Sequence, residues 1–546
     1  MPTTQQSARS SKVRALFCAS VLLALISQTA CRPAGQQADL RIINGSEPES
    51  LDPAIITSLA DSRIVKCLFE GLTRLNPKTA RAEPALAAGW QISPDGLVYT
   101  FDLRTNAVWS DGRPVVAEDV VWSWRRVLDP MTAADYAGQL YFVKNAEAYN
   151  TGQTNGLTGK RFVASDVGVY APDEHTVRVE LVGPTAFFLD LCAFPTLAVV
   201  PRHWIEQYGD RWLLKPGLPV NGTYRLENWR LNDRVRIRAN PLHWAADEVR
   251  SKVVDFIPMS SPATAMNLFV SGQADIIWDK SLIPSSLMDV LRKKPYCHTF
   301  GYLGSYFFRF NVTRKPFDDL RVRKALALSI DKRRIVENIT KAGEQLANHF
   351  VPPGTADYES PEGLAFDPEA ARRLLAEAGF PDGEGFPSFT YLMNNAPVDA
   401  QVSVELQAMW AKELGVKMEI RQAEWKVYLS EQSKLNFDLS RSSWIGDYND
   451  ANTFLDLFMS NNGNNRTGWR NERYDALIRE ANQQTDVARR RGLLQQAEQM
   501  LIRDELIVAP IYFYAGVNFF DPEKIEGIHF NLLDEHPVYA IKKKTK

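Results

Sequence analysis

Segments with the residue spacing of β-strands alternate along this chain with segments that have the spacing of α-helices. Residues 97–103 (LVYTFDL) alternate apolar and polar side chains, as a half-buried strand does. Residues 117–127 (AEDVVWSWRRV) repeat their apolar side chains with the period of a helix. Because both patterns recur throughout the chain, the sequence predicts mixed α/β lobes rather than a helix bundle or an all-β sandwich.

A helix over residues 370–378 has both of its ends specified by the sequence. Asp367 is its N-cap, Pro368 occupies its first turn and Gly379 follows its last turn. Residues 318–339 contain another helix, because their apolar side chains recur on one face. Both helices fit the α/β organisation.

Two further strands are predicted in the second half of the chain. Residues 416–420 and 507–513 contain few polar interruptions, which predicts central, buried positions in a sheet. The loop at residues 461–466 (NNGNNR) is too short for a flexible interdomain linker, and no internal repeat is present. We therefore expect the lobes to be connected by strands that cross between them.

The N-terminal segment has the pattern of an export signal. Arg9, Lys12 and Arg14 are positively charged, and residues 15–26 (ALFCASVLLALI) form an apolar run. That run is well short of the ~20 residues that a membrane span requires. We predict that residues 1–30 are a signal peptide and that the protein is exported.

Cys31 follows the signal segment in the sequence Q-T-A-C, which resembles a bacterial lipobox. In a lipobox the cysteine is lipidated and becomes the new N-terminus, although Gln28 stands here where Leu is usual. The polar residues 31–39 would then form a short tether. The alternative is an ordinary signal peptide with an incidental cysteine. The expected location is accordingly periplasmic, or lipid-anchored to the cell envelope.

Composition narrows the range of partners. With 45% hydrophobic and 23% charged residues and a net charge of −2, the chain has the balance of a globular protein and no attraction for a polyanion such as nucleic acid. No second stretch approaches spanning length, so we expect the rest of the chain to be soluble. Cys67, Cys192 and Cys297 can form at most one disulfide, and we expect buried free thiols.

Motifs of catalytic or metal chemistry are missing from the sequence. The seven histidines are scattered, and the sequence has no H-E-x-x-H, no two C-x-x-C pairs and no G-x-S-x-G. Residues 156–161 (GLTGKR) have the wrong glycine spacing for a phosphate loop, and Arg161 stands where Ser or Thr would bind magnesium. We predict no metal, no cofactor and no enzyme activity, although catalytic groups can also meet only in the fold.

Several blocks of sequence form one recognisable pattern. Residues 86–90 (LAAGW), 99–104 (YTFDLR), 109–114 (WSDGRP) and 119–124 (DVVWSW) carry its most specific part. Further blocks lie at residues 44–53, 68–72, 221–224, 240–244, 316–326 and 444–449. Together they resemble the bacterial extracellular solute-binding family that includes the oligopeptide- and dipeptide-binding proteins. The resemblance covers about residues 40 to 530.

This resemblance implies an α/β, two-lobed periplasmic-binding-protein fold of the large three-domain type, the peptide-binding-like class II. A ligand would be enclosed between the lobes as they close about a hinge. Domain I would comprise residues 40–69, 195–300 and 515–546, domain II residues 70–194, and domain III residues 301–514.

The implied function is that of the substrate-binding component of an ABC importer that captures short oligopeptides. The implied partners are a short peptide ligand and the permease subunits of the transporter in the inner membrane. Membrane contact would occur only through the N-terminal lipid anchor, and the protein is expected to be a monomer. Nutrient uptake and sensing are both compatible with this function.

A receptor for peptides of many sequences should hold the groups that all peptides share, the ammonium and the carboxylate, because burying either charge unpaired is costly. In the family a W-x-x-D-Y-N motif supplies an aspartate for the ammonium. Here the resemblance implies Asp447 for that role, with Trp444, Ile445 and Tyr448 beside it. It implies Arg441 for the carboxylate of short peptides.

The resemblance also implies that Trp425 forms the wall of a side-chain pocket. Three positions depart from the family pattern. Asp399 stands where the oligopeptide receptors carry a histidine used for longer peptides, and Gln432 where they carry an arginine. Cys297 has no obvious partner, because Ile445 occupies the place of the paired cysteine. The preferred peptide length therefore stays open.

Each site residue also has a purely structural interpretation: Asp447 as a turn residue, Arg441 as a member of an internal ion pair, and Trp425 as core packing. Within the family, the alternative ligands are nickel complexes, haem, opines, oligosaccharides and cell-wall peptides. From another class, a secreted hydrolase would explain export and an aromatic cleft, but it would require a nucleophile or a metal constellation.

Overall fold

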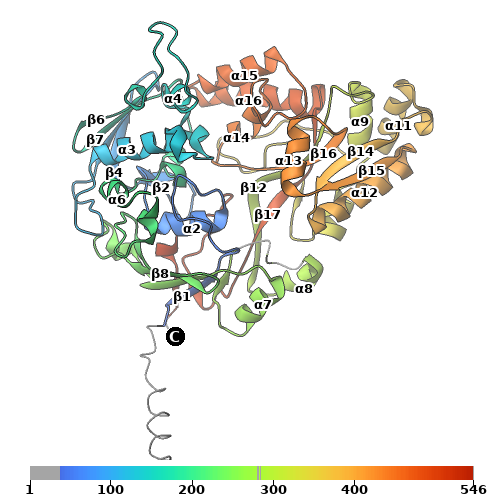
Figure 1. Cartoon of the computed structure of the whole chain (residues 1–546). Coiled ribbons are helices and arrows are strands. Elements are labelled where there is room, and N and C mark those ends of the chain that lie inside the picture. Colours follow the sequence, from blue (N-terminus) through green and yellow to red (C-terminus); the bar gives the residue numbers. More distant parts are fainter. Residues whose placement is uncertain (1–36, 279–281, 283–284, 545–546) are drawn as a thin grey trace, which may run out of the picture. The chain divides into compact units, whose positions relative to one another are not determined.

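The long mixed sheet of this protein is made by strands from both ends and the middle of the chain (Figure 1). The computed structural model describes residues 37–278, 282 and 285–544. The predicted signal peptide and Cys31 lie outside these residues. The chain from Leu40 onward forms one structural unit, which is described here.

Eleven strands form the large sheet, with β13 (Gln345–Leu346) paired to β17 beside the main path. In order across the sheet the other strands are β15 (Met418–Ala423), β14 (Phe389–Asn394), β16 (Leu439–Ile445), β12 (Cys297–Phe310), β17 (Val508–Phe520), β11 (Ile276–Ile277), β1 (Leu40–Ile43), β10 (Val253–Ile257), β9 (Arg234–Ala239) and β8 (Tyr224–Arg230). β14 is parallel to β15 and β16, and β1 is parallel to β10 and β11. The other pairs are antiparallel.

β12 and β17 are the long strands at the centre of this sheet, and they run side by side through the middle of Figure 1. The register of their pairing shifts twice, between Gly301 and Ser305 and between Tyr306 and Phe307. Gly301 lies opposite Ala515 and Ser305 opposite Phe513, so β12 has two more residues than β17 in this interval. Such an irregularity bends a strand and increases its twist. The two halves of the large sheet are therefore joined by a bent pair of strands.

Close packing at the bend requires glycine. A Cβ atom on Gly304 would lie 2.5 Å from Cδ1 of Ile445, and one on Gly446 would lie 2.6 Å from Cδ2 of Leu303. The Gly446 N–H donates to the Leu303 carbonyl oxygen at 2.8 Å. The end of β16 is thus fixed against the bend of β12.

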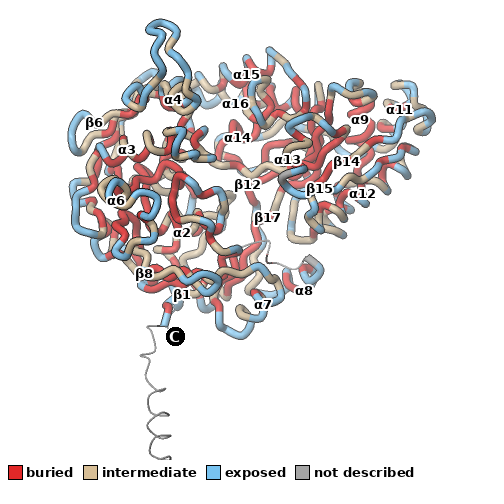
Figure 2. Tube along the Cα trace, viewed as in Figure 1, coloured by how far each residue is buried: buried red, intermediate tan, exposed pale blue. Residues whose placement is uncertain are grey.

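Successive residues of β12 point to opposite faces of the sheet. Phe308 lies in a core with Trp410, covered by α9 (Leu320–Leu328), α11 (Pro368–Glu377) and α12 (Pro397–Leu414). Phe307 lies in a second core with Tyr474, covered by α14 (Asn452–Leu455), α15 (Glu472–Asn482) and α16 (Val487–Gln499). Figure 2 shows the buried residues concentrated along these strands.

The other half of the large sheet packs on α2 (Leu59–Leu68), with Phe256 and Trp212 in its core. A separate four-stranded sheet has the order β4 (Ala87–Ile92), β5 (Val98–Leu103), β7 (Thr176–Glu180), β6 (Val169–Asp173). It packs on α3 (Ala117–Leu128), and Trp109 and Trp124 are fully buried in that core. Two of the tryptophan-containing blocks of the sequence therefore serve packing.

The remaining elements are short. The helices are α4 (Ala146–Asn150), α5 (Phe188–Leu191), α6 (Arg202–Tyr208), α7 (Pro262–Val270), α8 (Met288–Leu291), α10 (Lys332–Ile335) and α13 (Trp425–Ser433). The strands are β2 (Thr73–Leu75) with β3 (Ala82–Pro84), and β18 (Ile525–Glu526) with β19 (Lys542–Lys543). In the described part of the chain, no helix has the length and apolar character needed to cross a membrane.

Several sequence predictions are confirmed. β5 and α3 form where the strand and helix spacings predicted them, and α9 forms within residues 318–339. α11 begins after Asp367, whose carboxylate accepts a hydrogen bond from the Ala370 N–H at 2.9 Å. β17 is central and almost entirely buried, as expected for residues 507–513.

The predicted strand at residues 416–420 forms, but the prediction that it is central and buried is wrong. β15 forms there, but it is the edge strand of the sheet and pairs only with β14. Met418 is its only fully buried residue, whereas Glu419 and Gln422 are exposed. The polar residues between the apolar ones are the sign of an edge position, because only an edge or a solvated face lets them reach water.

The three cysteines within the described residues are free thiols, as expected. Cys67 and Cys192 are buried, and Cys297 is partly buried. Burial raises the pKa of all three thiols, and that of Cys297 to about 11. A thiol with a raised pKa carries little of the reactive thiolate near neutral pH.

We predict that iodoacetamide at pH 8 alkylates Cys297 slowly and leaves Cys67 and Cys192 unmodified until the protein is unfolded. The reason is that reagent access and thiolate formation are both restricted by burial. Mass spectrometry of the alkylated peptides, before and after denaturation, measures this. Equal alkylation rates for all three cysteines in the native protein would contradict it.

Candidate functional site

Asp447 lies just beyond the end of β16, where the chain turns away from the sheet. β16 ends at Ile445, and Gly446 follows in close contact with Leu303. The Asp447 N–H donates to Oγ1 of Thr453 at 3.3 Å. The position of Asp447 is therefore fixed by the sheet before it and by the residues that follow.

A cavity of about 1360 Å³, including its open mouth, lies at this end of β16. Trp444, Ile445, Asp447 and Tyr448 form part of its wall. The rest of the wall comes from residues 56–66, 136, 190–196, 302–303 and 532–535. Segments far apart in the sequence thus meet around one aspartate.

The carboxylate of Asp447 has no basic partner among the described residues. Its Oδ2 accepts one hydrogen bond, from Nε2 of Gln139 at 3.1 Å. Burial raises the pKa of Asp447 to about 6, and the hydrogen bond from Gln139 only partly offsets this. A partly buried carboxylate without a counter-ion is a binding position for a cationic group.

Neighbouring carboxyl groups strengthen the negative potential at this position. Burial, together with the charges of Asp447 and Asp450, raises the pKa of Asp456 to about 7. Asp450 itself is paired with Arg490, with 2.7 Å between Oδ2 and Nη1. Of this group, Asp447 is the one that lines the cavity.

Two contacts near the cavity join the first half of the chain to the second half. The ring of Tyr448 stacks on that of Phe187, with centroids 4.0 Å apart and planes inclined by 10°. Arg81 forms an ion pair with Asp357 at 3.3 Å. Of these four residues, Tyr448 lines the cavity at Asp447, and the other three line a neighbouring cavity.

Arg441 lies in a different environment. It is buried, and its Nε is 3.2 Å from Oδ1 of Asp399. Its Nη2 donates to the Tyr514 hydroxyl at 3.2 Å, and its guanidinium lies over the Tyr306 ring, 4.9 Å from the centroid. Burial lowers the pKa of Arg441, but Tyr514, Tyr306 and Asp399 outweigh it and raise the pKa well above its usual value. Its charge is therefore balanced inside the protein.

Trp425 is the first residue of α13 and is 48% exposed. Its ring stacks on Tyr428, with centroids 5.4 Å apart. Neither Trp425 nor Arg441 lines the cavity at Asp447. The structure brings Trp444, Ile445, Asp447 and Tyr448 together and places the other two predicted residues apart from them.

Two residues that sequence reasoning did not select also belong to this site. Gln139 donates to Asp447, and Tyr136 lines the same cavity. Burial raises the pKa of Tyr136 to about 12, and the charges of Asp447 and Asp135 add to the effect. Both residues precede Asp447 by some three hundred positions. No local pattern in the sequence could have connected them.

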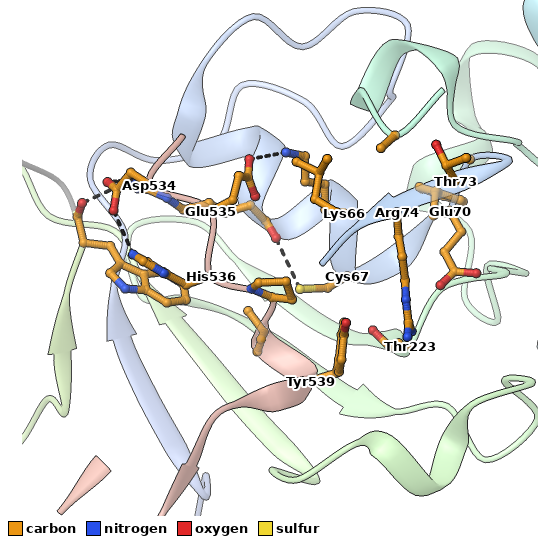
Figure 3. A pocket seen from close by; sticks show the side chains of 18 residues that line it. Lys66, Cys67, Glu70, Thr73, Arg74, Thr223, Asp534, Glu535, His536 and Tyr539 are labelled. Carbon is orange, nitrogen blue, oxygen red and sulfur yellow. Dashed lines mark hydrogen bonds and ion pairs between the residues drawn. The ribbon is translucent and has the colours of Figure 1, made fainter. Parts of the chain in front are cut away.

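A second cavity of about 790 Å³ adjoins the first, and Lys66 and Glu535 line both (Figure 3). Its carboxylates have internal partners. Glu535 is paired with Lys66, and Asp534 with His536 at 2.8 Å. Glu70 accepts hydrogen bonds from a buried histidine and a tryptophan. This cavity consequently offers no carboxylate that lacks a partner.

Within the described residues, no three histidine, cysteine, aspartate or glutamate side chains are grouped so that they could hold a metal ion. The predicted absence of metals and cofactors stays a prediction. The chemistry that the Asp447 cavity supports is the reversible holding of a cationic group.

Comparison with known proteins identifies the class. Residues 81–466 match the family model described as "Bacterial extracellular solute-binding proteins, family 5 Middle". The chain belongs to this family of binding proteins. Its fold is the two-lobed α/β fold of the family's solved members, as the sequence predicted.

Three similar proteins illustrate the range of the family. The periplasmic oligopeptide-binding protein OppA of Salmonella typhimurium is 34% identical over 93% of this chain and 94% of its own length. The probable deoxycholate-binding periplasmic protein YgiS of Escherichia coli is 33% identical over 90% of both chains. The crystal structure of an oligopeptide-binding protein of an ABC transporter from Borrelia burgdorferi has 30% identity and a TM-score of 0.78, covering 93% of this chain and 100% of that one.

We predict that Asp447 makes the stability of the ligand-free protein depend on pH between about 4 and 6. Its pKa of about 6 in the folded state lies above its ordinary value of 3.8, so the folded state binds the proton more tightly than the unfolded state. Stability from this group is therefore fully present below about pH 4 and is lost as the pH rises to about 6.

Chemical denaturation of the parent and of Asp447→Asn from pH 4 to 7 measures this effect. As the pH rises through this window, the free energy of unfolding of the variant should increase relative to that of the parent. Parallel pH curves for the two proteins would contradict the prediction.

Proposed function

We propose that this chain is the substrate-binding component of an ABC importer, and that it holds short peptides by their terminal ammonium at Asp447. The observation that carries the proposal is the carboxylate of Asp447, which faces the cavity without a basic partner among the described residues. An ammonium offers a full positive charge and three hydrogen-bond donors. Charge-assisted hydrogen bonds of this kind are roughly twice as strong as neutral ones.

The existing hydrogen bond leaves room for such a ligand. Gln139 engages Oδ2 of Asp447, and no hydrogen bond to Oδ1 is formed by the described residues. Gln139 therefore orients the carboxylate while the second oxygen faces the ammonium. A positioning role of this kind needs an amide, because a basic residue would neutralise the aspartate.

The walls of the cavity suit a peptide. Trp444, Tyr448 and Tyr136 contribute aromatic surface, and rings of this kind form rigid walls for ligands. With its open mouth the cavity measures about 1360 Å³, which is larger than the roughly 300–1,000 Å³ of sites that enclose small molecules and leaves space for a ligand of several residues. The names of similar proteins, which specify oligopeptides, support the same ligand class.

The other elements of this function rest on the family. We infer export to the periplasm or the cell envelope, with Cys31 as the site of lipidation, and delivery of the ligand to permease subunits by a monomer. Arg441 as carboxylate partner and Trp425 as pocket wall stay predictions. A bile-acid ligand, as named for YgiS, is disfavoured because a carboxylate in the cavity repels an anionic solute.

We predict that Asp447→Asn weakens peptide binding by well over tenfold and does not impair folding. The ammonium loses its only charged partner, whereas the folded protein loses a desolvated carboxylate that has no counter-ion. Isothermal titration calorimetry with a peptide identified by mass spectrometry of the copurified ligand measures the affinity. Asp456→Asn is the matched control, because Asp456 does not line the cavity. Equal affinities of parent and Asp447→Asn would refute the proposed site.

We further predict that acetylation of the peptide N-terminus abolishes binding. Acetylation removes the positive charge and leaves the amide with a single donor, while the rest of the peptide stays the same. A competition assay with the same peptide in free and acetylated forms tests this. If the acetylated peptide competes as well as the free one, the ligand is held by another group.

A further inference from the structure

Two arginines of the described chain, Arg309 and Arg466, lie close together without a carboxylate partner. Arg309 belongs to β12, and Arg466 follows the loop of residues 461–465. No ion pair to either of them is formed by the described residues, whereas Arg441 on the neighbouring strand β16 has one with Asp399. Unpaired cations of this kind are otherwise seldom left inside a protein.

The two side chains are linked by neutral hydrogen-bonding groups. Nε of Arg309 donates to Oγ of Ser442 at 2.7 Å, and its Nη1 donates to the Asn464 carbonyl at 2.8 Å. Nη1 of Arg466 donates to Oε1 of Gln432 at 3.3 Å. The amide of Gln432 in turn donates to Ser442 Oγ at 3.3 Å. Gln432 and Ser442 therefore lie between the two guanidinium groups.

The charges of this pair are not compensated. Arg309 is only 7% exposed, and burial lowers its pKa to about 10, an effect that Arg466 increases and Tyr428 opposes. Nε of Arg466 is buried and has no hydrogen-bond partner. Two like charges in a low-dielectric environment repel each other, and an anion between them would remove that repulsion.

Arg441, which precedes Ser442 on β16, is different, because Asp399 already balances its charge. A ligand carboxylate at Arg441 would have to compete with a buried carboxylate that is held in place by α12. At Arg309 and Arg466 a ligand carboxylate would meet two guanidinium donor groups and no competing anion. The uncompensated positive charge near β16 is thus at the arginine pair.

We propose that Arg309 and Arg466 form a binding site for a carboxylate group, and that this group is the acidic terminus of the bound peptide. The identification of the carboxylate with a peptide terminus rests on the proposed function. Guanidinium groups suit this role, because their planar forks bind a carboxylate through two parallel hydrogen bonds. Gln432 and Ser442 would hold the forks in position.

The spacing along β16 sets the length of the peptide. Ser442, which contacts Arg309, precedes Asp447 by five residues, and a strand rises ~3.3 Å per residue, so the two charged positions are at most ~17 Å apart along the chain. Trp444 lies between them, on the same face of the sheet as Ser442. An extended peptide of about four or five residues spans that distance.

The test compares peptides that differ only in their C-terminal charge. The full exported chain, freed of copurified ligand, is incubated with an equimolar mixture of randomised tetra- and pentapeptides, synthesised as free acids and as C-terminal amides. Mass spectrometry of the bound fraction gives the ratio of acid to amide. We expect the parent protein to retain the acids at least tenfold over the amides, and Arg466→Gln to retain both forms equally.

Arg470→Gln is the control, because Arg470 is an exposed arginine four residues further along. It should keep the parental ratio, and the thermal unfolding midpoint of Arg466→Gln should show that this variant is folded. Arg309 is not replaced, because it is buried and its replacement would disturb the fold. Arg441→Gln is included, because it separates this proposal from the prediction that Arg441 holds the carboxylate.

Three outcomes would overturn the proposal: equal retention of acids and amides by the parent, an unchanged ratio in Arg466→Gln, or loss of the ratio in Arg441→Gln alone. In each of these the parent still binds peptides in at least one of the two forms, so the proposed function survives. If the parent binds no peptide in either form, the proposed function fails, and this inference fails with it.

Discussion

The antiparallel pair of β12 and β17 is the interaction on which the rest of this structure depends. The two strands are long and buried, and they connect the half of the sheet that carries β14, β15 and β16 with the half that carries β1 and β8 to β10. Their two register shifts, between Gly301 and Phe307, bend this connection. The end of β16 packs directly on the bend, so Asp447 is positioned where the two halves meet. A site at such a junction senses any change in the angle between the two halves.

The chemistry of the site follows from which charges have partners. Most ionisable groups near β16 are neutralised inside the protein, as Arg441 is by Asp399 and Asp450 by Arg490. Among the described residues, Asp447 has only the amide of Gln139 as a side-chain hydrogen-bond partner. Within that part of the chain, Arg309 and Arg466 have only neutral hydrogen-bond partners. Groups left without a counter-ion cost stability in the free protein, and a ligand of opposite charge recovers that cost on binding. Under the two proposals, a zwitterionic ligand would engage both positions at once.

Much of the fold could be read from local patterns. The N-cap at Asp367 and the helical spacing of residues 117–127 predicted α11 and α3 nearly to the residue, because those signals act within one or two turns. The position of β15 in the sheet was predicted wrongly, because its apolar residues were given more weight than the polar residues between them, which reach water at the edge of the sheet. Gln139 and Tyr136 could not be found at all, since they reach Asp447 only after the chain has folded over some three hundred residues.

The sequence by itself determined the α/β class, the family and the segment that forms the wall of the cavity, because short-range periodicity and a contiguous motif are sufficient for these. Trp444, Ile445, Asp447 and Tyr448 are neighbours in the chain, and a turn after a strand keeps them together. Only the tertiary structure decided which charged residues are free to meet a ligand. Asp447 and Arg441 look equivalent as unpaired charges in the sequence, and the folded chain gives a counter-ion to the arginine alone. Ion pairing depends on a few ångströms between distant segments, and no local pattern encodes that distance.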